Sequence, residues 1–276
     1  MKRLAILVVV AVLPACGGFN LGGFSTADVL KAGSAVAQSQ RELTPDEERA
    51  IGRVVAARML GTYPLWEDAV RTRYLNLVGQ TVARQVGRAG TVWRFALLDT
   101  ESVNAYSCPG GYVFVTRGLL QSCSSEAELA AVLGHECGHV AGEHVLSAIK
   151  RANLVGAGIS IVSDHAGGGG LSADLMRKIG EAGFDALISR GLDRKDEFDA
   201  DARGCRIAHG AGYTTTPYAE FLRRLQQRLA GESGGALANL SKTHPSPADR
   251  LKELGDKGLI FADGKVLAER FARLGR

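Results

Sequence analysis

The stretch LGHECGHVAGEH, Leu133 to His144, holds three of the six histidines of the chain together with two glutamates. Within it, HECGH at residues 135–139 fits the pattern H-E-x-x-H. Residues four apart on a helix lie about 40° apart around its axis, so both imidazoles face the same side. Two such histidines suit Zn²⁺, and Glu136 projects beside them, where it can accept a proton from a zinc-bound water.

The residues around the motif favour a buried helix. Ser125 and Glu128 fit the pattern S-x-x-E of a capping box, which predicts a helix start just before the motif. Apolar side chains recur along the expected helix and would keep water away from the site. They are Leu129, Val132, Leu133 and Val140. The alternative is a solvated helix that is only rich in histidine and glutamate.

A catalytic zinc needs a third protein ligand and an open fourth position. His144 is the nearest candidate, but on a continuous helix it lies about 140° around the axis from His139. Val145 occupies the place where the longer pattern H-E-x-x-H-x-x-G-x-x-H would require a histidine. We therefore expect His144 to have a structural role or to lie at the rim of the site.

The acidic segment KDEFDAD, residues 195–201, offers a better third ligand. Glu197 and Asp201 are four apart and share a face of an expected helix. In this E-x-x-x-D arrangement the glutamate would bind zinc, and the aspartate would hold a ligand histidine by a hydrogen bond. The alternative is a solvated charged helix, because Asp193, Asp196 and Asp199 lie nearby.

The first residues have the pattern of an export signal. Lys2 and Arg3 precede an apolar run, Leu4 to Leu13, which is too short to span a bilayer. The run leads into LPAC, residues 13–16, which resembles a bacterial lipobox although its proline is unusual there. Residues 1–15 are therefore predicted to be a signal peptide and Cys16 to be lipid-modified. The alternative is an ordinary secretory signal with a nearby cysteine.

The residues that follow Cys16 bear on where the protein is held. Gly17, rather than an aspartate, is next, and in the lipoprotein sorting pattern this favours the outer membrane. Residues 16–43 are rich in Gly, Ser and Ala and are predicted to form a flexible tether. Acyl chains on Cys16 would bind the bilayer, because each buried methylene adds affinity. We therefore expect a location on the periplasmic face of the bacterial cell envelope.

Periodicity and composition predict one domain over residues 44–276, of the α+β class and mainly helical. Helices are expected at residues 44–60, 66–86, from 125 onward, 172–189, 193–209, 216–230 and 247–254. Strands are expected at 91–98 and 112–116. The chain has 276 residues, of which 46% are hydrophobic, and a formal charge of +4. Because no basic patch with interleaved aromatics occurs, nucleic acid is not expected as a partner.

Four cysteines follow Cys16 in the chain, at positions 108, 123, 137 and 205. An exported protein meets an oxidising compartment, so disulfides can form, and four cysteines permit three pairings. Cys108 and Cys123 are the most local pair. For Cys137, inside the motif, we expect a small buried residue.

Several segments together resemble one family, the zinc metallopeptidases that include HtpX, the CAAX prenyl proteases, BepA and LoiP, and within it the single-domain lipoprotein type. The segments are Asn104-Ala105, Pro109 to Leu120, Ser125 to Glu136, Glu197 to Asp201 and Thr243-His244-Pro245. With the helical region from Asp46, the likeness covers most of the chain after the tether. It implies a zincin-like fold with a small β-sheet and an active-site helix that carries H-E-x-x-H.

The resemblance also implies roles for individual residues. His135, His139 and Glu197 would bind one Zn²⁺, Glu136 would be the catalytic base, and Asp201 would support a ligand histidine. The family's substrate-binding edge strand matches Tyr112 to Thr116, and an extended peptide can add to such an edge by backbone hydrogen bonds. The substrate contacts implied there are Gly110, Gly111, Tyr112, Val113 and Phe114. Asn104 would touch the substrate backbone, unless it only forms a loop.

Thr243-His244-Pro245 resembles a loop that lies near the zinc in this family. His244 would act as a catalytic residue that stabilises the oxyanion, or it would plug the open zinc position. The alternative is a histidine that only organises the loop. Arg250 is expected to pair with acids near the site.

Together these features predict a zinc-dependent endopeptidase of the bacterial cell envelope that acts on extended or unfolded polypeptides. From the family alone, its substrates are expected to be misfolded or unassembled envelope proteins. The competing hypothesis is a zinc-stabilised, chaperone-like envelope lipoprotein with little proteolytic activity. The sequence favours the enzyme, because a purely structural zinc would not need Glu136 beside its ligands.

Overall fold

The computed structural model describes residues 43–151, 173–231 and 235–274. The predicted signal peptide, Cys16 and all of the predicted tether except Leu43 lie outside the described residues. The structure is mainly helical with one small sheet, which confirms the predicted α+β class. Within the described ranges, none of the helices combines the length and the apolar character that a bilayer span requires.

The predicted helices are present with small shifts at their ends. Helix α2 (Pro45–Leu60) begins with a capping box between Thr44 and Glu47. Only half of the predicted box at Ser125 and Glu128 forms: Ser125 accepts a hydrogen bond from Glu128 N, but the Glu128 carboxylate accepts from Ser124 N instead of from the N-cap. The remaining helical elements are α3 (Ala69–Ala83), α4 (Arg117–Ser122), α5 (Glu126–Ala141), α6 (His144–Arg151), α8 (Ala173–Asp185), the π-helical turn η1 (Ala186–Arg190), α9 (Arg194–Gly210), α10 (Thr216–Gly231), the 3₁₀ turn η2 (Gly235–Leu237), α11 (Ala238–Thr243), α12 (Pro247–Asp256) and α13 (Ala268–Ala272).

The sheet has three strands in the order β1-β3-β2. Strand β1 (Arg94–Leu98) is parallel to β3 (Tyr112–Thr116), and β2 (Ala105–Cys108) is antiparallel to β3. The sequence prediction that Tyr112 to Thr116 is the edge strand is therefore wrong. Because β3 is hydrogen-bonded on both sides, a peptide cannot add to it, and β2 is an edge instead.

The residues predicted as substrate contacts at that edge lie on this central strand and on the turn before it. Tyr112, Val113 and Phe114 belong to the central strand, and Gly110 and Gly111 form its turn with β2, at φ of 75° and 91°. Gly110 N donates a hydrogen bond to the Glu48 carboxylate at 2.8 Å, which ties the turn to α2.

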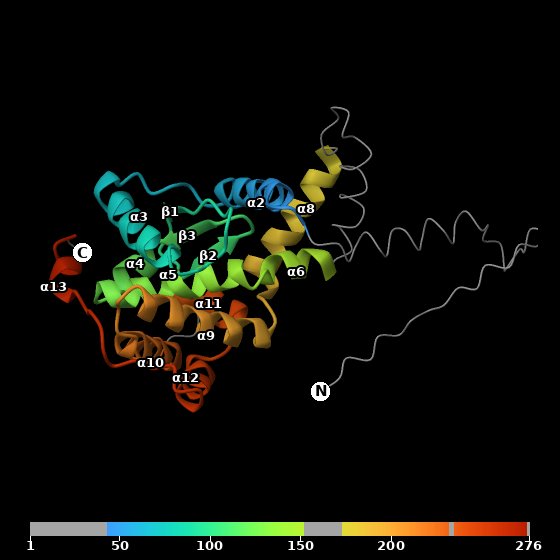
Figure 1. Cartoon of the computed structure of the whole chain (residues 1–276). Helices are drawn as coiled ribbons and strands as arrows, with labels where there is room; N and C mark the ends of the chain where they lie inside the picture. Colours follow the sequence, from blue (N-terminus) through green and yellow to red (C-terminus); the bar gives the residue numbers. More distant parts are fainter. Residues whose placement is uncertain (1–42, 152–172, 232–234, 275–276) are drawn as a thin grey trace, which may run out of the picture.

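Helix α5 lies at the centre of the fold. In Figure 1 it runs between a layer made of the sheet with α2 and α3 and a layer made of α9, α10 and α12. Every residue from Glu126 to Val140 is buried, so the helix is enclosed on all sides rather than on one apolar face. Around it packs the larger apolar cluster, which includes Leu75, Leu97, Leu129, Leu133 and Leu222. A smaller cluster joins α2, the sheet, α6 and α8 through Val55, Tyr106, Phe114, Ile149 and Ile179.

The contact between α5 and α9 is a close approach of two backbones. A Cβ atom at Gly134 would lie 2.6 Å from Gly204 O, and one at Gly204 would lie 2.6 Å from His135 N. A Cβ atom at Gly138 would lie 2.9 Å from Ala200 O. The glycines therefore allow a separation of the two helices that other residues would prevent.

Strand β2 was not predicted from the sequence. The four residues of β2 are all buried, so they show no alternation of polar and apolar residues that would mark a strand.

Cys108 lies in this strand, and it is not paired with Cys123. All four cysteines of the described part are free and buried, and the expectation of a small buried residue at Cys137 is confirmed.

Gly134→Ala is expected to lower the free energy of unfolding by about 1–3 kcal/mol, because the new methyl group would overlap the α9 backbone. Gly255→Ala is the matched control: a Cβ atom there, in α12, meets no atom within 4 Å. It should be neutral or stabilising by up to about 1 kcal/mol. Urea unfolding followed by circular dichroism compares the variants, and equal stability would show that the two backbones are not tightly packed.

Candidate active site

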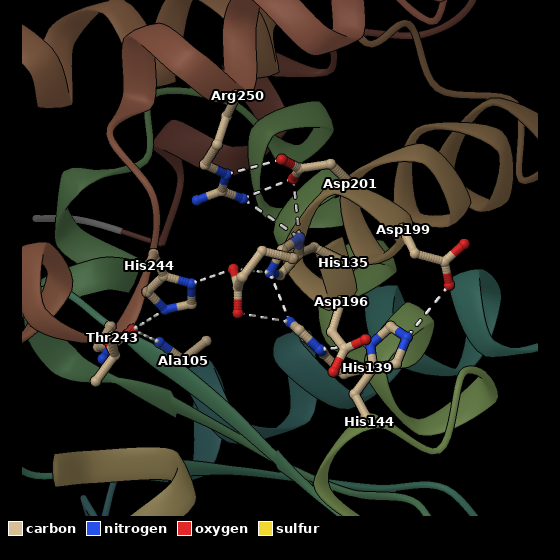
Figure 2. Close-up of polar contacts among 12 residues, drawn as sticks. Ala105, His135, His139, His144, Asp196, Asp199, Asp201, Thr243, His244 and Arg250 are labelled. Atoms are coloured by element: carbon tan, nitrogen blue, oxygen red, sulfur yellow. Dashed lines mark hydrogen bonds and ion pairs between the residues drawn. The ribbon is translucent and has the colours of Figure 1, made fainter. Parts of the chain in front are cut away.

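Helices α5 and α9 bring the predicted zinc ligands together. His135 and His139 lie one turn apart on α5, and their Nε2 atoms are 3.0 Å from each other (Figure 2). Glu197 lies in the first turn of α9, with its Oε1 3.4 Å from His139 Nε2 and its Oε2 3.7 Å from His135 Nε2. Two imidazoles and one carboxylate therefore face a common point.

These side chains are inaccessible to bulk water. The exposed fraction is 3% for His135 and His139, 4% for Glu136 and 1% for Glu197. The alternatives of a solvated histidine-rich helix and a solvated acidic helix are therefore both wrong. Buried polar groups of this kind cost free energy unless each has a partner, so the partners define the site.

Asp201 lies one turn after Glu197 and contacts the other side of the first histidine. Its Oδ1 is 2.9 Å from His135 Nδ1. Arg250 donates two hydrogen bonds to the same carboxylate, at 2.8 and 2.6 Å, and Tyr218 donates a third. Burial opposes a charge on Asp201, but Arg250 outweighs it and holds the pKa of Asp201 well below its usual range. The predicted pairing of Arg250 with a nearby acid is thus present.

His144 lies closer to the site than the sequence predicted. Helix α5 ends at Ala141 and α6 begins at His144, so the rotation expected for a continuous helix does not apply. The side chain is 5% exposed, and its Nδ1 is 2.9 Å from His139 Nδ1. The expectation of a rim position is therefore wrong. His144 is buried against His139.

His244, at the end of α11, faces Glu197 from a third direction. Its Nδ1 is 2.6 Å from Glu197 Oε2, and its Nε2 is 3.2 Å from the Asn104 side-chain oxygen. In the described part of the chain, potential ligand atoms of His135, Glu197 and His244 all lie within 4.8 Å of one another. Both His139 and His244 are thus placed to complete a metal group with the other two.

The pKa values of the two glutamates shift in opposite directions, although burial favours the protonated form of both. For Glu197 burial opposes the charge, but the imidazoles of His244, His139 and His135 outweigh it, so its pKa is low. For Glu136 burial dominates and raises the pKa, and the nearby imidazoles only partly offset it. One carboxylate therefore stays ionised as a ligand would, and the other holds a proton more readily than an ordinary glutamate.

Glu136 lies in a small pocket beside these residues. One wall is β2 with Ala105, Tyr106 and Ser107, and the opposite wall is η1 with the residues that follow it. The cavity volume is about 20 Å³, which is enough for about one water molecule. A larger cavity of about 350 Å³, lined by Pro245, Leu237 and Arg250 among others, also has His244 in its wall.

Sequence reasoning missed the wall formed by β2 and the role of Tyr218. The segment from Asn104 to Ser107 follows no strand pattern, but it holds buried polar atoms without a hydrogen-bond partner, namely Asn104 Nδ2, Tyr106 Oη and Ser107 Oγ. Tyr218, on α10, belongs to no motif, so no sequence signal pointed to it. Histidine at position 144 was noticed, but its position depends on where α5 ends.

The site has two imidazoles on one helix, a carboxylate on a second helix and a buried glutamate between the histidines. This arrangement defines a metallopeptidase of the H-E-x-x-H type with a zincin-like site. The sequence model of Peptidase family M48 matches residues 69–257. The chain therefore belongs to peptidase family M48.

Individual relatives agree with this assignment. The beta-barrel assembly-enhancing protease of Yersinia pestis is 28% identical over 76% of this chain and 44% of its own length. The mitochondrial metalloendopeptidase OMA1 of Arabidopsis thaliana is 31% identical over 62% of this chain and 33% of its own length. The metalloprotease YcaL of Escherichia coli is 26% identical over 95% of this chain and 97% of its own length.

The match to the first two relatives is limited to part of each of them, since this chain spans less than half of their length. The match to YcaL extends over nearly all of both chains. The family and the names of these relatives identify the matched region as a metalloendopeptidase domain.

Proposed function

We propose that the protein is a zinc endopeptidase of the bacterial cell envelope that cleaves extended segments of misfolded or unassembled envelope proteins. The convergence of His135, His139 and Glu197 beside the buried Glu136 carries the proposal. The export signal predicted at residues 1–15 and the relatives named beta-barrel assembly-enhancing protease support the location and the substrate class.

The donor set fits a divalent zinc ion. Two imidazole nitrogens and one carboxylate are ligands that Zn²⁺ prefers, and three of them leave a position open for substrate or water. We assign His135, His139 and Glu197 as the ligands, because the Nδ1 atoms of both histidines have other partners and their Nε2 atoms face each other. His244 has both ring nitrogens within hydrogen-bond distance of Glu197 and Asn104, so we place it beside the ligand set.

A bound Zn²⁺ would polarise the scissile carbonyl and lower the pKa of water from its bulk value towards about 7. Glu136 takes the proton from the attacking water and delivers it to the leaving amine. Its raised pKa suits this exchange, because a glutamate that is never protonated could not return the proton. When the His244 Nε2 leaves the Asn104 side-chain oxygen, it donates to the developing oxyanion of the substrate.

Strand β2 is the proposed docking edge for an extended substrate. Thr116 N donates to Asn104 O, so the backbone groups of alternate residues, Asn104 and Tyr106, face β3. The backbone groups of Ala105 and Ser107 then point away from the sheet, along the pocket that contains Glu136. A peptide that pairs with them would lie across the site with weak demands on its side chains.

A chaperone-like envelope protein with little proteolysis is the second candidate. The small pocket and the direct contact of His244 with Glu197 favour it, because together they keep a peptide out of the site. Zinc-dependent cleavage of an unfolded protein that stops with a chelator separates the two: it supports the enzyme. Suppressed aggregation of the same protein without cleavage supports the chaperone.

Glu136→Gln is expected to keep about one zinc per chain and to slow the cleavage of casein by about 10²–10⁴-fold, because the amide cannot accept the proton. Metal analysis and a gel-based cleavage assay on the same samples measure the two effects. Glu220→Gln, on the exposed face of α10, is the matched control and should cleave normally. Unchanged cleavage by a contaminant-free Glu136→Gln sample would reject the base assignment.

Peptides methylated on single backbone nitrogens test the docking edge. If the substrate pairs with β2, methylation should lower kcat/KM strongly at every second position and weakly at the positions between, because only alternate amides face the edge. Kinetics on a series of one test peptide provide the measurement. A decline that shows no alternation would exclude strand pairing.

Replacement of Cys16 tests the anchor. In bacteria that express the full chain and grow with labelled palmitate, the unmodified protein should take up label and sediment with membranes. Cys16→Ser should remain unlabelled, because acylation requires the thiol. Membrane-bound protein without label would point to an ordinary secretory signal or another means of attachment.

A further inference from the structure

His144 is held against His139 by a break between helices α5 and α6. Between α5 and α6, Glu143 has φ of 54°, in the left-handed region that non-glycine residues rarely adopt. Arg88 binds the Glu143 carboxylate at 2.8 Å and also donates to Val140 O, so it contacts the chain at the break and at the end of α5. At this break the His144 ring lies beside the end of α5.

Gly142 provides the space for this ring. A Cβ atom at Gly142 would lie 2.2 Å from His144 Nε2. The rings of His139 and His144 meet edge to face, with centroids 5.1 Å apart and planes at 83°. A glycine, a strained residue and an arginine thus combine to place one imidazole on another, which indicates a role for the contact.

The polarity of the hydrogen bonds shows what that role is. The two Nδ1 atoms are 2.9 Å apart, so one of them carries a proton and the other accepts it. If His139 is to offer a lone pair at Nε2 to a metal ion, its proton must be on Nδ1 and point to His144. His144 then carries its own proton on Nε2, which lies 3.2 Å from the Asp199 carboxylate (Figure 2).

The opposite polarity would disable the site. A proton on His144 Nδ1 would move the His139 proton to Nε2, where it would face His135 Nε2 at 3.0 Å and block a ligand bond. Asp199 disfavours this state, because a carboxylate accepts hydrogen bonds and draws the His144 proton to Nε2. Asp199 also accepts a hydrogen bond from Arg203.

We propose that His144 is a positioning residue that, together with Asp199, fixes the tautomer of His139 and thereby strengthens zinc binding. The proposal rests on the proposed metal-dependent function. It gives His139 a partner comparable to the one that Asp201 provides for His135. Partners of this type change metal affinity by about 10–100-fold.

The test measures the zinc Kd of the full chain by competition with a chromophoric chelator, and the Tm of the zinc-free protein. His144→Phe keeps a ring of similar size but has no acceptor, and its Kd should rise by about 10–100-fold. His144→Asn places an oxygen near the former Nδ1 and should restore binding to within a few-fold. His209→Phe, at the far end of α9, is the matched control and should leave the zinc Kd unchanged.

Three results would overturn the proposal. The first is a zinc Kd of His144→Phe equal to that of the unmodified protein, even if its Tm falls. The second is an equal loss in His144→Phe and His144→Asn. The third is a weaker Kd in both that follows a drop in the zinc-free Tm. If the unmodified protein itself binds no zinc, the proposed function fails; if it binds zinc and cleaves while His144→Phe binds equally well, only the His144 proposal fails.

Discussion

The backbone contact between α5 and α9 is the constraint on which the site depends. The two helices are antiparallel at this contact, with Gly134 opposite Gly204 and Gly138 opposite Ala200. The register places Asp201 beside His135 and Glu197 beside His139, one helical turn further along. Because the glycines allow the two helices to approach closely, the carboxylates of Asp201 and Glu197 can reach the two histidines. This one helix contact brings together two motifs that lie far apart in the sequence.

The site concentrates polar groups where water is excluded, and its stability depends on complete pairing. Arg250 is the buried cation that offsets the charge of Asp201, and it is itself 5% exposed. Breaking such a pair leaves one buried charge without compensation, which costs about 3–5 kcal/mol. The same residues therefore support the fold and orient His135. A cation bound by the two histidines and Glu197 would offset the charge of the Glu197 carboxylate in the same way.

The sequence predicted the chemistry of the site better than its surroundings. Local spacing on helices places His135, Glu136 and His139, and Glu197 with Asp201, because helical periodicity is short-range. The order of strands depends on pairing between distant segments, so the edge was assigned to β3 instead of β2. The position of His144 depends on where α5 ends and on the φ of Glu143, for which the sequence has no clear signal. Tyr218 joins the site only through tertiary packing.

The four free cysteines of the described part have a consequence for the reactivity of the folded protein. Burial raises the pKa of every one of these thiols, that of Cys205 to about 12. At neutral pH the reactive thiolate form is therefore scarce, and oxidants and thiol-exchange enzymes cannot reach the sulfur atoms. In the folded state, burial thus protects these four thiols from reaction.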